Sequence, residues 1–239
     1  MAGRGRPRAF DRDTALRRAM EVFWTQGYEA TSMTDLTSAM GIASPSLYAA
    51  FGSKEALFRE AVTLYDATEG APMAQALTEL PSARDAVEAV LRWNARAYTA
   101  EGSPSGCMIV LAATNCSPAN APVRDHLATW RKAGARLTAR RLDRAVQEGE
   151  LPADTDTEAM AAFYTTVIQG MSVQARDGAT GADLDRTVDR AMAAWEVVAM
   201  PATARPTAAA ARPEPADDRS KPADDRSAPA TTRPASSTA

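Results

Sequence analysis

Apolar residues recur with helical spacing along most of this chain, and this pattern limits the fold more than any other feature. In residues 157–176, one helical face collects the apolar residues Met160, Phe163, Tyr164, Val167 and Met171. Similar stripes run through residues 11–26, 82–98, 122–148 and 182–199. No stretch before residue 201 alternates apolar and polar residues as a half-buried strand does. The sequence therefore predicts an all-α fold.

Near the N-terminus, short helices are predicted at the spacing of a helix-turn-helix unit. The residues at their N-cap positions are Asp11, Ser32, Ser44 and Ser53. Residues 41–43, Gly-Ile-Ala, supply the three-residue turn between the second and third helices. The residues expected to pack together are Met33, Leu36, Met40, Ile42, Leu47 and Phe51 against Leu16, Met20 and Phe23. This packing leaves the outer face of residues 44–50 free.

That free face suits entry into a DNA major groove, where a recognition helix must bring its backbone close to base edges. The candidate base-contacting residues are Ser44, Pro45, Ser46 and Ala49. Serine hydroxyls can exchange hydrogen bonds with bases, and Pro45 and Ala49 can contact a thymine methyl group. Tyr48 suits a phosphate contact because it projects a hydroxyl from a rigid ring. Lys54 suits one because its ammonium lies at the positive N-terminal end of the fourth helix. The same helix pattern also occurs in all-α proteins that bind no nucleic acid.

The distribution of charge favours the nucleic-acid interpretation. The chain has a net charge of −3, but residues 1–18 hold six arginines against two aspartates. Residues 19–200 hold 15 basic and 23 acidic side chains. A basic arm carrying Arg4, Arg6 and Arg8 can follow a phosphate backbone or enter a minor groove. A charged terminus that is merely solvated is the alternative explanation.

Several motifs in this region occur in a fixed order. They are Gly27-Tyr28, the Thr/Ser-rich Thr31, Ser32 and Thr34, the turn Gly41-Ile42, the Leu-Tyr-x-x-Phe run from Leu47 to Phe51, and the Ser-Lys-Glu-x-Leu run from Ser53 to Leu57. Through them, residues 5–62 resemble the DNA-binding domain of the TetR/AcrR family of bacterial transcriptional regulators. The resemblance implies a sequence-specific regulator, a repressor released from a palindromic operator by a small-molecule effector.

Residue roles also follow from the resemblance. It implies that residues 44–49 face bases, that Tyr48 and Lys54 contact phosphates, and that Thr31 or Thr34 contacts the DNA backbone. Where this chain has Ser46, the family often has glycine, and where it has Ala49 and Ala50, the family often has an aromatic residue or histidine. The base preference therefore does not transfer.

For the rest of the chain, the resemblance implies a helical ligand-binding and dimerisation domain. Its last two helices, predicted at residues 157–176 and 182–199, would form a four-helix bundle with a second subunit, so that two recognition helices lie about one DNA turn apart. The candidate effector-binding residues are Trp93, Tyr98, Cys107, Met108, Trp130, Phe163, Tyr164 and Met171. Each of these also suits an ordinary core position.

The two cysteines allow a second mode of regulation. Cys107 and Cys116 are candidates for sensing an oxidant, an electrophile or a soft metal through their thiolates. A separation of nine residues places them on different faces of a helix, and buried cysteines are often inert. With His126 as the one histidine, no metal site is predicted, no cofactor is implied, and an all-α enzyme is the least supported alternative.

Composition sets the predicted domain limits. Residues 1–9 are expected to form a basic flexible arm, 10–62 the helix-turn-helix domain, 63–200 the helical effector-binding and dimerisation domain, and 201–239 a disordered tail. The tail contains no Leu, Ile, Val, Met, Phe, Tyr or Trp, and holds seven of the 15 prolines. The chain shows no apolar run near the roughly 18 residues needed to span a bilayer and no signal-peptide pattern. A cytoplasmic protein without membrane contact is expected.

Overall fold

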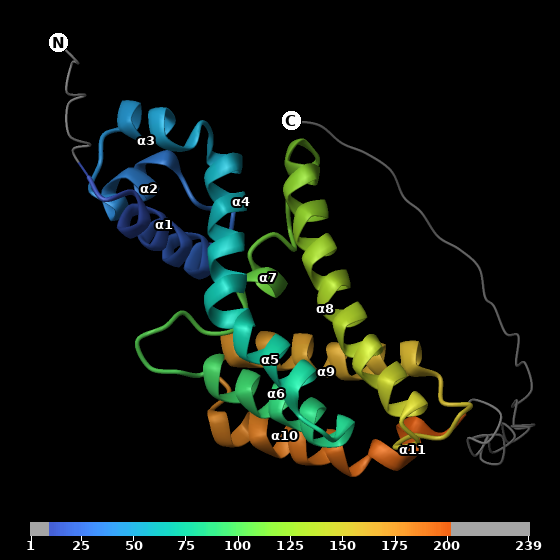
Figure 1. The fold of residues 1–239 in the computed structure, drawn as a ribbon. Coiled ribbons are helices and arrows are strands. Elements are labelled where there is room, and N and C mark those ends of the chain that lie inside the picture. Colours follow the sequence, from blue (N-terminus) through green and yellow to red (C-terminus); the bar gives the residue numbers. More distant parts are fainter. Residues whose placement is uncertain (1–9, 202–239) are drawn as a thin grey trace, which may run out of the picture. The chain divides into compact units, whose positions relative to one another are not determined.

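The computed structural model describes residues 10–201, which form helices joined by turns (Figure 1). The N-terminal helices are α1 (Arg12–Gln26), α2 (Met33–Met40), α3 (Ser44–Phe51) and α4 (Lys54–Tyr65). The next elements are the π-helical turn η1 (Asp66–Gly70), α5 (Ala71–Glu79), α6 (Ala83–Ala97) and α7 (Met108–Leu111). The last are the 3-10 turn η2 (Pro118–Asn120), α8 (Ala121–Gln147), α9 (Thr157–Arg176), α10 (Gly181–Ala193) and α11 (Trp195–Ala199). Residues 10–201 contain no strand, so the all-α prediction is confirmed.

Some predictions fall on residues outside this range. The basic arm at residues 1–9, with Arg6 and Arg8, and the tail beyond Pro201 lie outside the described residues. The predicted boundary between residues 62 and 63 falls inside α4, which is continuous, and it stays a prediction. Within residues 10–201, no helix has both the length and the apolar character required to cross a membrane.

Side-chain caps begin three of the first four helices where the sequence predicts them. The Asp11 carboxylate accepts the backbone N–H groups of residues 13 and 14 at 2.9 and 3.1 Å. Ser32 and Asp35 cap each other's backbone N–H groups, at 3.1 and 2.8 Å, which is a complete capping box. The Ser53 hydroxyl accepts the N–H of Ala56 at 3.0 Å.

The start of α3 corrects the prediction by one residue. Its N-cap is Ala43, which makes no side-chain cap bond, and Ser44 and Pro45 are its first two helical residues. The reason is that the Ala43 carbonyl already accepts the N–H of Leu47 at 3.1 Å, so the helical bonding begins one residue earlier than expected. The Ser44 hydroxyl therefore takes no part in capping and stays on the outer face.

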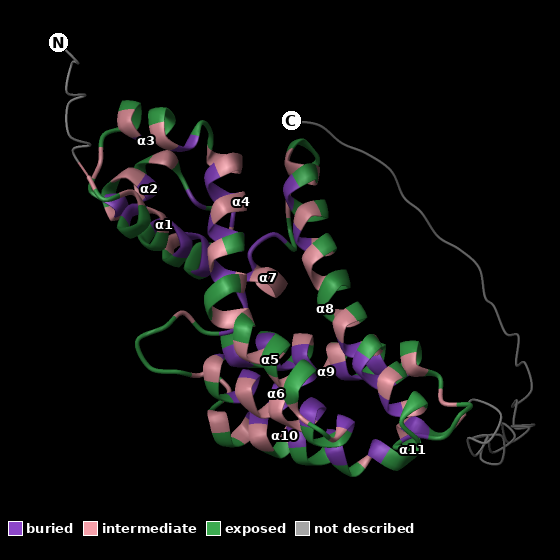
Figure 2. Cartoon of the chain, viewed as in Figure 1, coloured by how far each residue is buried: buried purple, intermediate pink, exposed green. Residues whose placement is uncertain are grey.

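An aromatic cluster holds the N-terminal helices together. Phe23 and Phe58 are fully buried, with ring centroids 5.0 Å apart at 86°, and Tyr28 meets Phe58 at 5.0 Å. Such edge-to-face pairs add about 0.5–1.5 kcal/mol each beyond the burial of area. Of the predicted core residues, Met20, Phe23, Leu36, Met40, Leu47 and Phe51 are buried, and Leu16, Met33 and Ile42 are partly buried. In Figure 2, the buried residues of α1 and α4 lie on the sides that face each other.

The segment that follows α4 contains two elements that sequence analysis missed. A π-helical turn, η1, leads into α5, which begins with Pro72 in its first turn. Only Leu77 of α5 is buried, so its apolar periodicity is weak. The π-helical turn itself leaves no pattern in the sequence.

The sequence predicts one helix carrying Cys107 and Cys116, but the helix in this segment is much shorter in the structure. Only residues 108–111, which form α7, are helical. The Ala112 carbonyl accepts the backbone N–H of Tyr28 at 2.6 Å, which draws the chain toward α1. Before α7, Gly106 has a φ of 77°, and a Cβ at this position would lie 2.6 Å from the Ser172 carbonyl oxygen. Only glycine fits this close approach.

The remaining helices largely match expectation. α8 continues through Gly134, whose surroundings leave open space, so the glycine costs about 1 kcal/mol without breaking the helix. α9 has the predicted bounds, 157–176. The helix predicted at 182–199 divides at Ala194 into α10 and α11. Figure 1 shows α9 and α10 beside α6, and α7 between α4 and α8.

Candidate nucleic-acid interface and effector cavity

The outer face of α3 is exposed, small and polar. Its exposed residues are Ser44, Pro45, Tyr48 and Ala49. Tyr48 is 50% exposed, Ser46 is half-buried, and Leu47 and Phe51 fix the opposite face in the core. The first turn of α3 is therefore rigid underneath and unobstructed outside, as a helix that enters a groove must be.

An arginine that sequence analysis missed holds the other end of α3. The Arg12 guanidinium lies 4.4 Å from the centre of the Phe51 ring and donates to both Glu60 carboxylate oxygens at 2.7 and 2.9 Å. It also donates to the Ala50 carbonyl at 3.4 Å. Arg12 thus ties the end of α3 to α1 and α4, which a count of basic residues does not reveal.

Lys54 occupies the first turn of α4, as predicted, but is only partly exposed. Its ammonium lies 4.4 Å from the centre of the Tyr28 ring, a cation–π contact. Burial lowers the pKa of Lys54, and the neighbouring Glu29 opposes this effect. No salt bridge occupies the ammonium within residues 10–201, so its N–H groups are available to a phosphate.

The two threonines proposed to contact the DNA backbone differ in exposure. Thr34 is exposed on α2. Thr31 is only 1% exposed, and its hydroxyl donates to the Gly27 carbonyl at 2.6 Å. The Thr31 hydroxyl therefore closes the turn between α1 and α2, and Thr34 is the exposed member of the pair; the contact of Thr31 or Thr34 with the DNA backbone stays a prediction.

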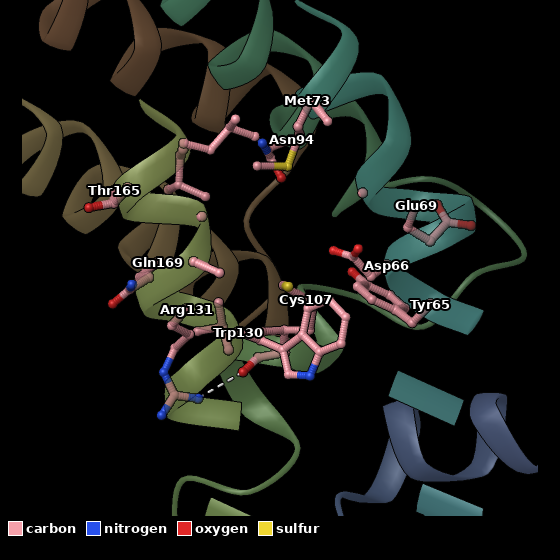
Figure 3. A pocket seen from close by; sticks show the side chains of 18 of the residues that line it. Tyr65, Asp66, Glu69, Met73, Asn94, Cys107, Trp130, Arg131, Thr165 and Gln169 are labelled. Atoms are coloured by element: carbon pink, nitrogen blue, oxygen red, sulfur yellow. Dashed lines mark hydrogen bonds between the residues drawn. The ribbon is translucent and has the colours of Figure 1, made fainter. Parts of the chain in front are cut away.

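A cavity of about 480 Å³ lies among η1, α5, α6, α7, α8 and α9 (Figure 3). This volume lies in the range of small-molecule sites. Trp93, Tyr98, Cys107 and Trp130 line it, as predicted. Figure 3 shows the Tyr65 side chain and the Cys107 thiol close together on this wall.

Half of the predicted effector residues lie elsewhere. Met108, Tyr164 and Met171 are at most 1% exposed and belong to the core, and the Tyr164 hydroxyl donates to the Ala191 carbonyl at 3.3 Å. Phe163 is 38% exposed on the outer side of α9. None of these four residues lines the cavity; the face of α9 that reaches it carries Thr165, Ile168 and Gln169 instead.

Part of the cavity lining was not predicted from the sequence. Trp24 and Tyr65 reach the cavity from α1 and α4, with ring centroids 4.8 Å apart at 84°. The spacing of Phe58, Val62 and Tyr65 was a usable signal, since it continues one apolar stripe of α4. Asp66 and Glu69 line the cavity only because of η1, which had no signal.

The two cysteines have different surroundings, and both are free thiols. Cys107 is buried on the cavity wall. Burial, and then the interaction with the neighbouring Cys107 side chain, raise the pKa values of Tyr65 and Tyr98 well above the usual range. Cys116 is half-buried outside the cavity, and burial followed by the nearby Glu29 raises its pKa. The structure does not join the two cysteines into one site.

His126 is occupied by protein contacts. Its Nε2 accepts a hydrogen bond from the Trp130 indole at 3.1 Å, and its Nδ1 lies 3.0 Å from an Arg59 guanidinium nitrogen. Burial and the Arg59 charge lower the pKa of His126. Within residues 10–201, no group of three or more metal-ligating side chains is arranged to hold a metal ion.

Hydrogen bonds connect the cavity wall to α1. The Trp24 indole donates to the Gly106 carbonyl at 2.9 Å, and the Tyr28 N–H donates to the Ala112 carbonyl. At the end of α9, the Arg176 guanidinium donates to the carbonyls of Trp24 and Thr25 at 2.9 and 3.0 Å. The segment that lines the cavity is thus bonded directly to the helix that supports α3.

Family models match both parts of the chain. Residues 15–61 match the model described as bacterial regulatory proteins of the tetR family, and residues 83–195 match a tetracyclin repressor-like C-terminal domain. Among curated relatives, the transcriptional repressor ComR of Escherichia coli K12 is 38% identical over 178 residues, covering 74% of this chain and 85% of ComR. The repressor BdcR of the same organism is 32% identical, covering 73% and 83%.

Solved structures agree with these matches. A cysteine-substituted variant of the TetR-family regulator CifR, in complex with a 26-base-pair operator DNA, is 49% identical with a TM-score of 0.78, covering 80% of this chain and 100% of that chain. A putative TetR regulator from Rhodococcus sp. RHA1 is 38% identical with a TM-score of 0.52, covering 79% and 99%. This chain belongs to the TetR family of bacterial transcriptional regulators.

Proposed function

We propose that this regulator is a repressor that binds a palindromic operator as a homodimer and leaves it when a small molecule enters the cavity. The observation that carries the DNA-binding part is the rigid, exposed first turn of α3 beside the available Lys54 ammonium. The 49% identical CifR variant bound to operator DNA supports the same role.

In this proposal, base reading and phosphate binding are separate tasks. Ser44, Pro45, Ser46 and Ala49 would contact base edges, because they are small and lie in the first turns of α3. Tyr48 and Lys54 would bind phosphates, and together with Thr34 they fix the register of the helix. The arm with Arg6 and Arg8 would add a minor-groove or backbone contact.

The exposed apolar residues of α9 support dimerisation. Phe163 is 38% exposed and Val173 is 46% exposed, and Gly170 between them has open space where a Cβ would be. Residues 163, 170 and 173 share one side of the helix, since their spacings approximate whole turns. We propose that this side of α9, with α10 and α11, packs against a second copy.

The effect of a bound ligand on DNA binding would be transmitted through the cavity wall. A bound molecule would contact Tyr65 at the end of α4 and Cys107, Ile109 and Val110 around α7, and both segments are bonded or packed to α1. Because α4 also packs on α1 and α3, a shift of its end moves the recognition helix. The ligand must bind the released arrangement more tightly than the DNA-bound one to act in this way.

A thiol-based mode remains a second candidate at the same cavity. Cys107 lies on the wall beside two tyrosine rings, so an electrophile that enters the cavity would meet this thiol. Treatment with N-ethylmaleimide should then abolish DNA binding in the natural chain and spare a Cys107→Ser variant. Equal loss in both would exclude Cys107 as the responsive group.

A gel mobility-shift assay tests the proposed function. The full chain should retard the intergenic DNA beside its own gene at low salt. Tyr48→Ala and Lys54→Ala should each weaken binding by about tenfold or more, and Lys54→Ala should reduce the salt dependence by about one counterion. Lys132→Ala, an exposed lysine on α8, is the matched control and should bind normally. Equal binding by all variants, or no shift at all, would refute the assignment of α3 and α4.

A further inference from the structure

One wall of the cavity carries a carboxylate with no cationic partner. Asp66 is the first residue of η1, is half-buried, and makes no side-chain hydrogen bond or ion pair with any other described residue. Burial raises its pKa, and no neighbouring positive charge counteracts this effect. A half-buried carboxylate without a partner is costly in the empty protein, so a ligand with a complementary charge would gain from it.

The π-helical turn is what directs this carboxylate. In Figure 3, the side chains of Tyr65 and Asp66 point toward Cys107 and Trp130, whereas the Glu69 carboxylate points away from them. Gly70 leaves room for the arrangement, because a Cβ there would lie 2.8 Å from an Asp66 carboxylate oxygen. Such turns are frequent at functional sites.

Two tryptophans from other helices line the same cavity as Asp66. Trp93 on α6 and Trp130 on α8 both line the cavity, and the Trp130 ring is held in place by its bond to His126. Indole faces attract cations that lie within about 6 Å of their centres. A cavity of about 480 Å³ lined by an acid and two indole rings suits a positively charged group on an apolar body.

The basic residues of the lining are less available. The Arg131 guanidinium donates to the Ile109 carbonyl at 2.8 Å, and burial lowers the pKa of Arg131. Arg140 is exposed at the margin. An anionic ligand would have to compete with the Arg131 bond or bind at the solvent edge, whereas a cation finds Asp66 free.

We propose that the cavity binds an organic cation, an amine or quaternary ammonium with an aromatic or aliphatic body, with Asp66 as its charge partner and Trp93 and Trp130 as its walls. The inference rests on the proposed function only in treating this cavity as the effector site. Binding at η1 would place the ligand at the junction of α4 and α5, next to the helix that supports α3.

Isothermal titration calorimetry of the full chain tests the inference with probes that share one body. The probes are 4-phenylbutyltrimethylammonium, 4-phenylbutanol and 4-phenylbutyrate. The ammonium probe should bind at least about tenfold more tightly than the other two. Asp66→Asn should remove that preference and leave the alcohol unaffected, while Glu69→Gln, on the same turn, should change the ammonium affinity by less than about threefold.

The outcomes separate the two proposals. Tighter binding of the carboxylate would make Arg131 the charge partner, and equal binding of cation and alcohol would remove any role for Asp66; either overturns the inference. Binding of none of the probes also overturns it. The comparison among probes on the natural chain holds even if a variant does not fold. The mobility-shift assay tests DNA binding independently of every one of these results.

Discussion

Arg176 offers the sharpest test of how the C-terminal helices are joined to the DNA-binding helices. It is the last residue of α9, and its guanidinium donates to three carbonyls, those of Trp24, Thr25 and Ser105, at 2.9, 3.0 and 3.2 Å. Two of these carbonyls belong to the last turn of α1, where they have no helical partners. The arginine therefore also neutralises the negative end of that helix.

Arg176→Met keeps most of the aliphatic length and removes all three bonds. A hydrogen bond to a charged group contributes about 1.5–3 kcal/mol when buried, but this site is mostly exposed, and the orphaned carbonyls can bind water. We therefore expect a total loss of about 2 kcal/mol in the free energy of unfolding. The DNA affinity should also fall, because α1 is less firmly held.

Urea denaturation followed by circular dichroism, at one fixed protomer concentration, measures this loss. The matched control is Arg186→Met, which removes an exposed ion pair with Asp183 on α10 and should lower stability much less than Arg176→Met. If Arg176→Met is no more costly than Arg186→Met, the reasoning about α1 and α9 is refuted.

Further predictions concern stability. Gly106→Ala should lower the free energy of unfolding by roughly 3 kcal/mol, because its φ is positive and the new Cβ would clash with α9. Gly149→Ala, at the same φ but in open space, should lower it by about 1 kcal/mol in the same denaturation assay. Similar losses in the two variants would contradict the close approach of Gly106 to α9. Glu150→Gln should cost about 2 kcal/mol, since the Arg141 side chain is only 1% exposed and loses its carboxylate partner. Burial raises the pKa of Glu150, but the Ala83 N–H and Arg141 outweigh it and hold the pKa below 4.5. The folded state thus binds a proton at Glu150 less readily than the unfolded state. The stabilisation by the ionised Glu150 carboxylate should therefore be present at neutral pH and lost as pH falls below about 4.5. An unchanged midpoint of acid unfolding in Glu150→Gln would contradict this role of Glu150. Thr31→Val should lower stability by about 1 kcal/mol through its lost bond to Gly27, with DNA affinity measured by anisotropy unchanged, and a specific affinity loss would support Thr31 as a contact.

Local sequence signals predicted most helix bounds. The caps at Asp11, Ser32 and Ser53 and the apolar stripe of α9 all depend on residues a few positions apart, so they can be read without the fold. The predicted helix bounds are wrong where contacts between distant segments of the chain determine the structure. α7 ends early because Ala112 bonds to Tyr28.

In the candidate sites too, features set by local sequence were predictable, and features set by contacts between distant segments were not. The outer face of α3 was predictable, since a short amphipathic helix has only one face to expose. The cavity was predictable only in part. Tyr164 and Met171 share the stripe of residues expected to line it, but that stripe faces the core. Asp66 reaches the cavity through η1, a turn that has no local signal in the sequence.

Hydroxyl-radical footprinting on the intergenic DNA tests most directly whether two copies of α3 read an operator. The natural chain should protect two half-sites of related, inverted sequence whose centres lie about one helical turn, roughly 34 Å, apart. Tyr48→Ala should remove both protected segments together at a concentration that saturates the natural chain. Protection that is uniform along the DNA, or confined to a single half-site at saturation, would contradict sequence-specific binding by a homodimer.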